Sequence, residues 1–431
     1  MKEISVVKKT ALLFIILALI LCSGCFDATE IDEFGYTSAI GLDKGKTNHL
    51  KMTFQIEIPK NIGGGEGGGS EGKSFTITSV ETPTIYSGMN MINAYISKRI
   101  NTTHTKVIVI SEELAREGIE KYIQAFVRGR EFRPNMYIII AKGSAEDYIK
   151  NVDPKMEIHP AKYYELNTRS FWYTGFTAET SLFNFYLQQE CTCSQPVADL
   201  GAVGRFESTD EFDLEGSTYK EKGREYPRSG DFTAGEIPST GEEKSVIFGL
   251  AVFDGGKMVG TLDGQEALYY LMLTGQYKYS YITFLDPLSN NNYVVLNVKQ
   301  RRKPVRRVEM SGDKPNIYAK IMLEADFESI QSGINYESVE NHRTFEQAAE
   351  EFLQKEMLLF LKKTTQQFNS DICQFGKNIK GRFLTWDEWM EFEWLKKYSG
   401  SSFNIEVDLK VRRPGLMIRS TPGYSSKGEG V

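Results

Sequence analysis

Cysteine and histidine, the residues that most often carry metal, redox or nucleophilic chemistry, are few in this chain and lie far apart. The 431 residues include five Cys and four His. They are Cys22, Cys25, Cys191, Cys193, Cys373, His49, His104, His159 and His342. None stands in the C-x-x-C or H-E-x-x-H spacing that is typical of structural zinc sites and zinc hydrolases. We therefore predict no metal site built from these residues.

Cys191 and Cys193 are separated by a single residue. This spacing is too short for an unstrained disulfide within the pair, and two thiolates supply only half of the four ligands that zinc takes. We therefore predict no bond between them, while oxidation with the distant Cys373 is left open. His104 stands just before an apolar strand with no Asp or Glu nearby in the sequence, which indicates a structural or surface histidine.

Gly63, Gly65 and Gly68 satisfy the G-x-G-x-x-G pattern of dinucleotide-binding loops. In such loops a helix must follow directly, because its amides and dipole hold the pyrophosphate. Here the pattern predicts another strand instead, and seven of the ten residues from Gly63 to Gly72 are Gly. We predict a flexible hairpin loop rather than a nucleotide site.

Acidic residues do not point to an enzyme either. Asp and Glu together number 57, so no catalytic pair can be selected from their spacing. We predict no catalytic, cofactor-binding or metal-binding residue. The densest basic cluster is Arg301-Arg302-Lys303 with Arg306 and Arg307. It could meet lipid headgroups or an acidic partner, but a solvated strand end is the more frequent explanation. The net charge of -6 argues against nucleic acid as a partner.

The N-terminus has the pattern of a secretion signal. Three lysines precede an uninterrupted apolar run from Ala11 to Leu21, which is too short for a membrane-spanning helix of about 20 residues. The sequence Leu21-Cys22-Ser23-Gly24-Cys25 resembles the bacterial lipoprotein box, in which a peptidase cuts just before a lipid-modified Cys. We predict a signal peptide over residues 1–24 and lipidation of Cys25, with simple secretion or an uncleaved anchor as alternatives.

The length of the chain favours two or three domains over one hydrophobic core. A content of 41% hydrophobic and 25% charged residues is typical of a globular protein rather than a polytopic membrane protein or a disordered chain. We predict an N-terminal α/β domain over 25–155 and a middle aromatic-rich segment with a polar linker or insertion over 156–245. A C-terminal α/β domain over 246–416 and a disordered tail over 417–431 follow.

Hydrophobic periodicity predicts the elements of the N-terminal domain. Strict alternation over 50–58 indicates a strand, and 75–80 is its expected partner. The other predicted elements are a helix from Thr82-Pro83 to about residue 100, a strand over 105–110, helical turns over 111–127, a strand over 136–141 and a short helix opened by Ser144. Strands therefore alternate with helices in this domain.

The C-terminal domain shows the same two periods. Its predicted elements are strands over 246–253 and 258–262, a helix capped by Asp263 and Glu266 and ended by Gly275, strands over 293–298 and 317–327, and a last strand over 403–411. Apolar residues also keep helical spacing from Leu353 to Ile379. We therefore predict a helix of some 35 residues that packs one stripe on the C-terminal sheet.

From Cys25 onward the chain resembles the Ger(x)C family of spore germination lipoproteins, the C subunits of nutrient germinant receptors. The matching segments are Cys25-Phe26-Asp27-Ala28-Thr29-Glu30-Ile31, Ala39-Ile40-Gly41-Leu42-Asp43-Lys44, the Gly-rich loop, His104-Thr105-Lys106-Val107-Ile108-Val109-Ile110, Glu112-Glu113-Leu114-Ala115, Arg133-Pro134, Ala141-Lys142-Gly143, Gly249-Leu250-Ala251-Val252-Phe253, Gly260, Leu262-Asp263-Gly264, Asp371, Phe375-Gly376, Trp386 and Val411-Arg412-Arg413-Pro414-Gly415-Leu416. Phe26, Ala28 and Thr29 replace the family's Trp and Arg pair, and residues 206–245 are longer than its usual middle.

This resemblance implies a non-enzymatic receptor subunit. The subunit would be anchored by lipid such as palmitate to the outer face of the spore's inner membrane and assembled with two polytopic membrane subunits. The resemblance also implies a multidomain α/β (α+β) fold with mixed sheets. Two rival functions are a lipid-anchored extracytoplasmic solute-binding protein, with a cleft between two lobes, and a cell-envelope hydrolase.

Overall fold

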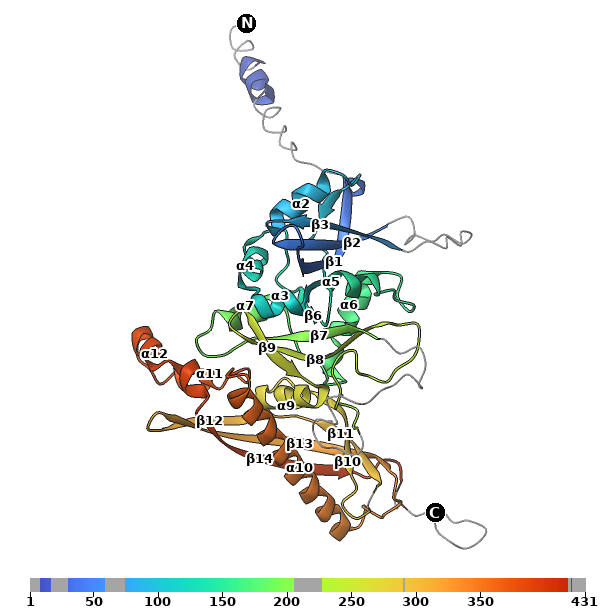
Figure 1. The fold of residues 1–431 in the computed structure, drawn as a ribbon, viewed down its shortest axis with the longest axis vertical. Coiled ribbons are helices and arrows are strands. Elements are labelled where there is room, and N and C mark those ends of the chain that lie inside the picture. The colour runs from blue at the N-terminus through green and yellow to red at the C-terminus, as the bar shows by residue number, and fades with distance from the viewer. Residues whose placement is uncertain are drawn as a thin grey trace, which may run out of the picture.

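The structure is a computed structural model that describes residues 8–16, 30–58, 74–204, 227–289, 291–417 and 420. Residues 8–16 are helical, and the rest form two β-sheets with their helices, one after the other along the long axis of the molecule (Figure 1). Within the described ranges, no helix combines the length and the apolar character that crossing a membrane requires.

The larger sheet has nine strands in the described part of the chain, in the order β3-β2-β1-β5-β6-β7-β8-β9, with β4 beside β1. They are β1 (Phe34–Lys44), β2 (Leu50–Glu57), β3 (Phe75–Thr82), β4 (Arg99–Asn101), β5 (Val107–Ser111), β6 (Tyr137–Ala141), β7 (Val197–Val203), β8 (Ser245–Asp254) and β9 (Lys257–Leu262). The central strands β1, β5, β6 and β7 run parallel, and antiparallel hairpins flank them on both sides.

Helices cover both faces of the larger sheet, as parallel crossovers require. They are α2 (Ile85–Asn93), α3 (Glu112–Glu117), α4 (Glu120–Arg128), α5 (Ala145–Lys150), α6 (Pro160–Thr168) and α7 (Leu182–Gln189), with short 3₁₀ turns η1 (Ile31–Glu33) and η3 (Ser170–Trp172). One apolar cluster joins α2, α3, α4 and α7 to one face, and a second joins α5 and α6 to the other. All five residues of β5 are consequently buried.

The smaller sheet has the order β10-β11-β13-β12, with β14 parallel to β13. Its elements are α9 (Gly264–Thr274), β10 (Tyr279–Leu285), β11 (Tyr293–Lys299), β12 (Val305–Ser311), β13 (Lys314–Ile330), α10 (Val339–Gln366), α11 (Gly376–Lys380), α12 (Trp386–Phe392), α13 (Trp394–Tyr398) and β14 (Ser402–Arg413). Alternate residues of β13 are buried against α10, so that one face forms a core. Helix α9 lies between the two sheets (Figure 1), and residues 264–273 in it are all buried.

Most predicted elements are confirmed, and so is the α/β class with mixed sheets. The predicted hairpin pairs β2 with β3, and the predicted Asp263–Glu266 capping box begins α9, which ends at Gly275 in the left-handed conformation. Two helix predictions are wrong in extent. Helix α2 begins at Ile85, capped by Thr84, and ends at Asn93, because the next residues turn to place β4 beside β1.

The predicted 35-residue helix is also shorter, since α10 ends at Gln366. The apolar spacing continues past this point because the loop after α10 and the helix α11 that follows it bury residues in the same core. These are Phe368, Ile372 and Phe375 in the loop and Ile379 in α11. Asn369 and Gln374 in this loop have φ of 49° and 63°, values that interrupt a helix.

The division between the sheets does not fall at residue 246, where we placed the start of the C-terminal domain. Strand β7 comes from the middle segment, β8 begins at Ser245 and β9 at Lys257, yet all three belong to the larger sheet. The first two strands of the C-terminal segment therefore complete the sheet that the N-terminal segment begins.

Candidate functional site at the junction of the two sheets

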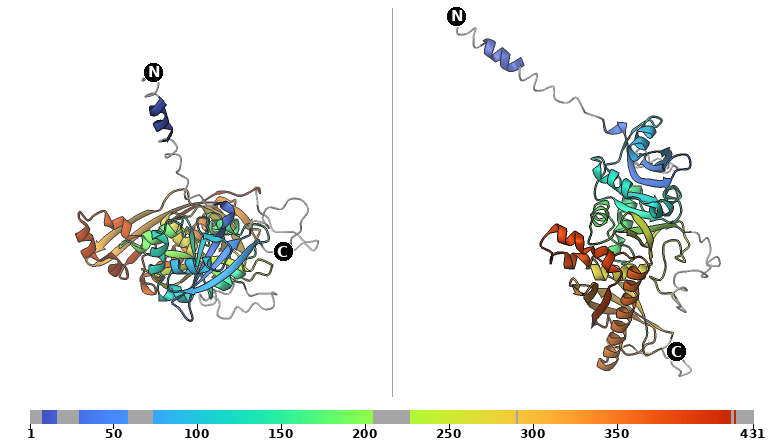
Figure 2. Two further views of the ribbon diagram at one scale, coloured as in Figure 1. Left: turned by 90° about the horizontal axis from the view of Figure 1, so that it is seen from above. Right: turned by 60° about the vertical axis from the view of Figure 1, so that its left-hand side comes forward.

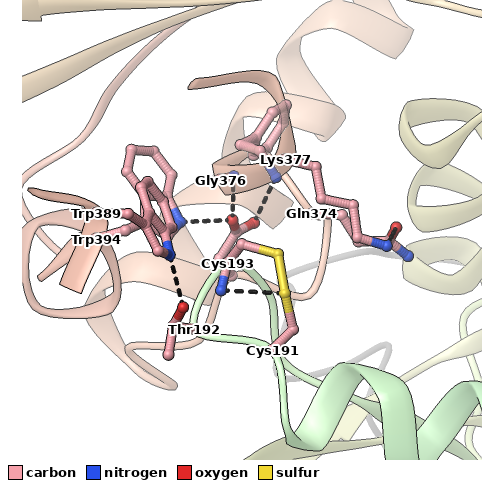
Figure 3. The surroundings of a disulfide bond; sticks show 10 residues. Cys191, Thr192, Cys193, Gln374, Gly376, Lys377, Trp389 and Trp394 are labelled. Carbon is pink, nitrogen blue, oxygen red and sulfur yellow. Dashed lines mark hydrogen bonds between the residues drawn. A yellow bond between two sulfur atoms is a disulfide. The ribbon is translucent and has the colours of Figure 1, made fainter. Parts of the chain in front are cut away.

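Cys191 and Cys193 form a disulfide, contrary to our prediction (Figure 3). Their spacing in the sequence is short, but the turn after α7 brings the two Cα atoms to 5.1 Å, within the usual range for disulfides. Cys373 is buried and free, so no bond to the distant cysteine forms. Burial raises the pKa of the Cys373 thiol well above its usual value, which makes it a poor nucleophile.

Thr192, between the two cysteines, connects this turn to the C-terminal helices. Its hydroxyl accepts a hydrogen bond of 2.6 Å from the indole N–H of Trp389 on α12. The neighbouring Gly376, at the start of α11, has no room for a side chain. A Cβ there would lie 2.4 Å from the carbonyl oxygen of Cys193 and 2.5 Å from the indole nitrogen of Trp394. The disulfide turn is therefore packed directly against α11 and α13.

Asp371 organises the loop that follows α10. Its carboxylate is fully buried and accepts three hydrogen bonds, from the backbone N–H of Phe375 (3.0 Å), that of Gly376 (2.8 Å) and the indole N–H of Trp394 (2.9 Å). Its backbone carbonyl accepts from the N–H of Gln195 (3.0 Å). One acidic residue thus holds α11, α13 and the segment after the disulfide in one place.

The positive charge of Arg306 acts on this buried carboxylate. Burial raises the pKa of Asp371 to about 6, against the opposite pull of its hydrogen bonds and of Arg306. The Arg306 guanidinium is itself largely buried, and it donates to the carbonyl oxygens of Cys373 (2.7 Å) and Leu273 (3.3 Å). The predicted basic cluster is therefore divided, because Arg306 points into the junction whereas Arg301 is exposed and pairs with Glu324.

Three further contacts cross the junction. The Ser370 hydroxyl donates to the carbonyl of Phe253 on β8 (2.7 Å). The Lys363 ammonium of α10 reaches the Glu266 carboxylate at the start of α9 (2.8 Å) and the carbonyl of Thr261 (3.0 Å). These contacts, with Asp371, fix the smaller sheet to the larger one through buried polar groups, and they favour a rigid structural joint over a hinge.

A second candidate is a cavity of about 860 Å³ at the carboxyl ends of β1, β5 and β6. Ligands of α/β sheets commonly bind at this edge. Here three of the charged side chains are engaged within the protein, because Asp43 accepts from the N–H groups of Ala145 and Glu146, and Glu146 pairs with Lys51. This arrangement stabilises the start of α5.

The remaining predicted sites lie away from the junction or outside the described ranges. Cys25 and the segment from Gly63 to Gly72 are not among the described residues, so their predicted roles stay predictions. His104 makes an edge contact with the ring of Tyr36 at 5.2 Å between ring centres. No cluster of three potential metal ligands occurs within the described ranges.

The Gly-rich segment also contains two catalytic patterns besides the dinucleotide-binding one. Residues 68–72 match G-x-S-x-G, and residues 67–74 match G-x-x-x-x-G-K-S. Both patterns act only where a helix follows them. The next element of the structure is strand β3, which begins at Phe75, and not a helix, so this context does not support either activity.

Two family models match the chain. "Spore germination protein N-terminal domain" matches residues 27–197, and "Spore germination B3/ GerAC like, C-terminal" matches residues 248–415. Spore germination protein KC of Bacillus subtilis (strain 168) is 25% identical over 414 residues, which cover 93% of this chain and 94% of that protein. Spore germination protein GerQC of Bacillus cereus is 22% identical over 412 residues, 95% of this chain and 99% of that protein.

Similarity to other proteins is more local or limited to the fold. The putative spore germination protein YfkR of Bacillus subtilis (strain 168) is 32% identical over 150 residues, which span 38% of that protein. The crystal structure of the GerBC protein superposes with a TM-score of 0.51 at 14% identity, covering 86% of this chain and 96% of that one. At this identity the match supports the fold alone.

Proposed function

Because this chain belongs to the Ger(x)C family of spore germination proteins, we propose that it is a lipid-anchored, non-enzymatic subunit of a nutrient germinant receptor. The observation that carries this proposal is that the two family matches together include strands of both sheets. In the proposed role the chain sits on the outer face of the spore's inner membrane. It completes a complex with two polytopic subunits rather than turning over a substrate.

The junction is compatible with a supporting subunit. Its buried groups, Asp371, Arg306 and the Cys191–Cys193 disulfide, are engaged with the protein itself. A solute-binding protein would instead need a ligand cleft between two lobes that close. The two functions can be separated by calorimetry of the purified mature chain with nutrients. Binding with micromolar affinity would favour the solute-binding protein, whereas we expect no saturable heat.

A germination assay tests the biological role. Spores that lack this chain should fail to respond to at least one nutrient that triggers the parent spores. The intact chain, supplied again, should restore that response. Unchanged germination over a broad set of nutrients would contradict the proposal.

Anchoring through Cys25 has its own test. We expect Cys25→Ala to abolish lipidation, and acyl chains stabilise membrane attachment by about 0.8 kcal/mol per buried CH₂. Since the unprocessed signal could still tether this variant, it must be compared with a version of the chain that carries an ordinary secretory signal. That version should stay soluble in fractionation when the polytopic subunits are absent. Sedimentation with membranes that lack them would show that lipid is not the main anchor.

A further inference from the structure

The chain enters the fold at one pole of the molecule, and the smaller sheet occupies the other (Figure 2). At the entry pole, β4 runs beside the start of β1, and the Lys98 ammonium donates to the backbone carbonyl of Asp32. Helix α2 lies at the same end (Figure 1). Glu30 is only five residues after Cys25, which an extended chain spans in at most about 17 Å.

Large apolar side chains are exposed at this pole. Helix α2 buries Ile85, Met89 and Ile92 against the sheet. Met91 on the other side of α2 is 44% exposed and Tyr95, in the turn after α2, is 58% exposed, while Ile31 in η1, where the chain enters the fold, is 77% exposed. The Tyr95 hydroxyl is held by the carbonyl of Ser79 (3.3 Å), so that the ring is fixed at the surface rather than free to fold inward.

Arginines adjoin this apolar surface. The loop after α4 is joined to α2 by a ring contact of Phe132 with Tyr86, at 6.1 Å between centres. It is joined to the segment after β4 by a hydrogen bond of 3.1 Å from the Thr102 hydroxyl to the carbonyl of Glu131. The exposed arginines of this region are Arg99, Arg128, Arg130 and Arg133. None of these four forms an ion pair with any other residue that the structure describes.

Charge at this pole is nearly balanced, because Glu30, Asp32, Glu33 and Glu131 are also there. The pole is thus an amphipathic surface rather than a strongly basic patch. Tyrosine and methionine bury an apolar body, and arginine buries its stem while its guanidinium stays at the polar layer. These are the side chains that favour the headgroup region of a bilayer.

We propose that this entry pole, formed by Ile31, Tyr86, Met91, Tyr95 and the four arginines, rests in the headgroup layer of the bilayer that holds the anchor. The short connection from Cys25 keeps the pole within reach of that layer, which is several ångströms thick on each side of the hydrocarbon core. The protein then stands on the membrane with its smaller sheet directed away from it. This orientation rests on the proposed lipidation of Cys25.

Quenching by lipid tests the orientation with a matched pair of variants. Met91 and Tyr279, on β10 of the smaller sheet, are 44% and 45% exposed. The full lipidated chain, as Met91→Trp or as Tyr279→Trp, is reconstituted into vesicles of phosphatidylethanolamine and phosphatidylglycerol with brominated acyl chains. After the signal of the four native tryptophans is subtracted, we expect at least threefold stronger quenching at position 91. Equal quenching at the two positions would overturn the proposal.

A second version separates this inference from the anchor itself. Residues 1–25 are replaced by a hexahistidine segment held on a nickel-chelating lipid, which keeps the short connection without lipidation. Stronger quenching at position 91 than at position 279 in this version supports contact between the entry pole and the bilayer. This holds even if the native chain fails to float with vesicles, because that failure would count only against lipidation of Cys25. The opposite outcome is that tryptophan at position 91 escapes quenching by lipid in this version and is shielded from iodide, a quencher in water, only in membranes that hold the polytopic subunits. In that case the entry pole contacts protein rather than lipid, and the proposal is wrong.

Discussion

The two sheets of this protein are covered in different ways. The larger sheet packs helices on both faces, so that its central strands β5 and β6 are almost wholly buried. The smaller sheet packs α10 and its neighbours on one face only, and no helix among the described residues packs on the other. Ion pairs such as Lys299–Asp326 and Lys320–Glu406 line that second face.

The different coverage of the two sheets indicates which surfaces of the molecule can contact other molecules. A sheet enclosed on both sides is a rigid base, while a sheet with one polar face offers a broad surface to solvent or to another protein. The junction decides whether these two parts behave as one body. Disrupting the junction should therefore have the largest effect on stability, and altering a buried acid of the larger sheet should have the smallest.

Asp371→Ala should have the largest effect. Loss of the carboxylate leaves two backbone N–H groups and one indole N–H without their buried acceptor, and it removes the negative charge that interacts with the Arg306 guanidinium. We expect this to cost about 3–5 kcal/mol in the free energy of unfolding. Urea unfolding of the mature chain measures this loss of stability. Asp313→Ala is the control, since Asp313 is 92% exposed in its pair with Lys397, and its removal should leave stability unchanged. Equal urea midpoints for the two variants would contradict the stabilising role of Asp371 at the junction.

Leu353→Ala should have the second largest effect on stability. Leu353 is fully buried between α10 and the smaller sheet, and the cavity left behind should cost about 2–5 kcal/mol. Leu359→Ala, at a position on the same helix that is 52% exposed, should cost far less. If the junction is rigid, amide hydrogen exchange should show protection falling in both sheets. Loss confined to the smaller sheet would mean that the two parts unfold separately.

Gly376→Ala tests the packing of the disulfide turn. The added Cβ would press on the Cys193 carbonyl and the Trp394 indole, and overpacking of this kind costs about 1–3 kcal/mol. Gly381→Ala is a matched control, because no atom lies within 4 Å of a Cβ built there. Thermal unfolding of the two variants should separate them. If Gly381→Ala were as unstable as Gly376→Ala, the loss of stability would come from helix geometry and not from contact of the added Cβ with the disulfide turn.

Asp199→Asn should have the smallest effect at neutral pH and a clear pH dependence. Burial raises the pKa of Asp199 on β7 to about 8, against hydrogen bonds from Ala178 and Thr180. The folded state therefore keeps a proton that the unfolded state releases above about pH 4, so wild-type stability falls as pH rises from about 4 to 8. The variant lacks this dependence.

Chemical unfolding at two pH values one unit apart, both between the unfolded and folded pKa values of Asp199, measures the effect. The stability of the variant relative to wild type should rise by about 1.4 kcal/mol over that unit of pH. An amide can keep the hydrogen bond from the Ala178 N–H and donate to the Thr180 hydroxyl, so no large loss is expected at neutral pH. A constant difference between the two proteins would mean that Asp199 is ionised in the folded state.

Each sheet contains strands that were predicted and strands that were missed. In the smaller sheet, one-sided burial leaves strict alternation in β13 and β14, and both strands were predicted. Strand β10 was missed because its exposed face also carries large apolar side chains, and β12 was missed because it buries only Val308. In the larger sheet, β7 contains a buried Asp199 and a Gly201 packed against Tyr148, so it shows no alternation and was missed. Strands β8 and β9 were predicted, but local patterns do not reveal which sheet a strand joins.

The junction was beyond prediction for a related reason. Asp371 and Gly376 appeared only as segments shared with the Ger(x)C family, because nothing local indicates that residues near 193, 306 and 371 meet. The Cys191–Cys193 bond was missed because the spacing of the two thiols does not reveal the turn that holds them. Lipidation of Cys25, by contrast, is predicted from a contiguous pattern in the sequence, and it stays a prediction because Cys25 lies outside the described residues.

The most direct test of the central claim is purification of this chain from detergent-solubilised spore membranes. We expect two polytopic membrane proteins to accompany it in constant proportion. We also expect a mature N-terminus at a lipidated Cys25 by mass spectrometry of the same sample. Recovery of the chain alone, in detergents that preserve other membrane complexes, would contradict its assignment as a subunit of a germinant receptor.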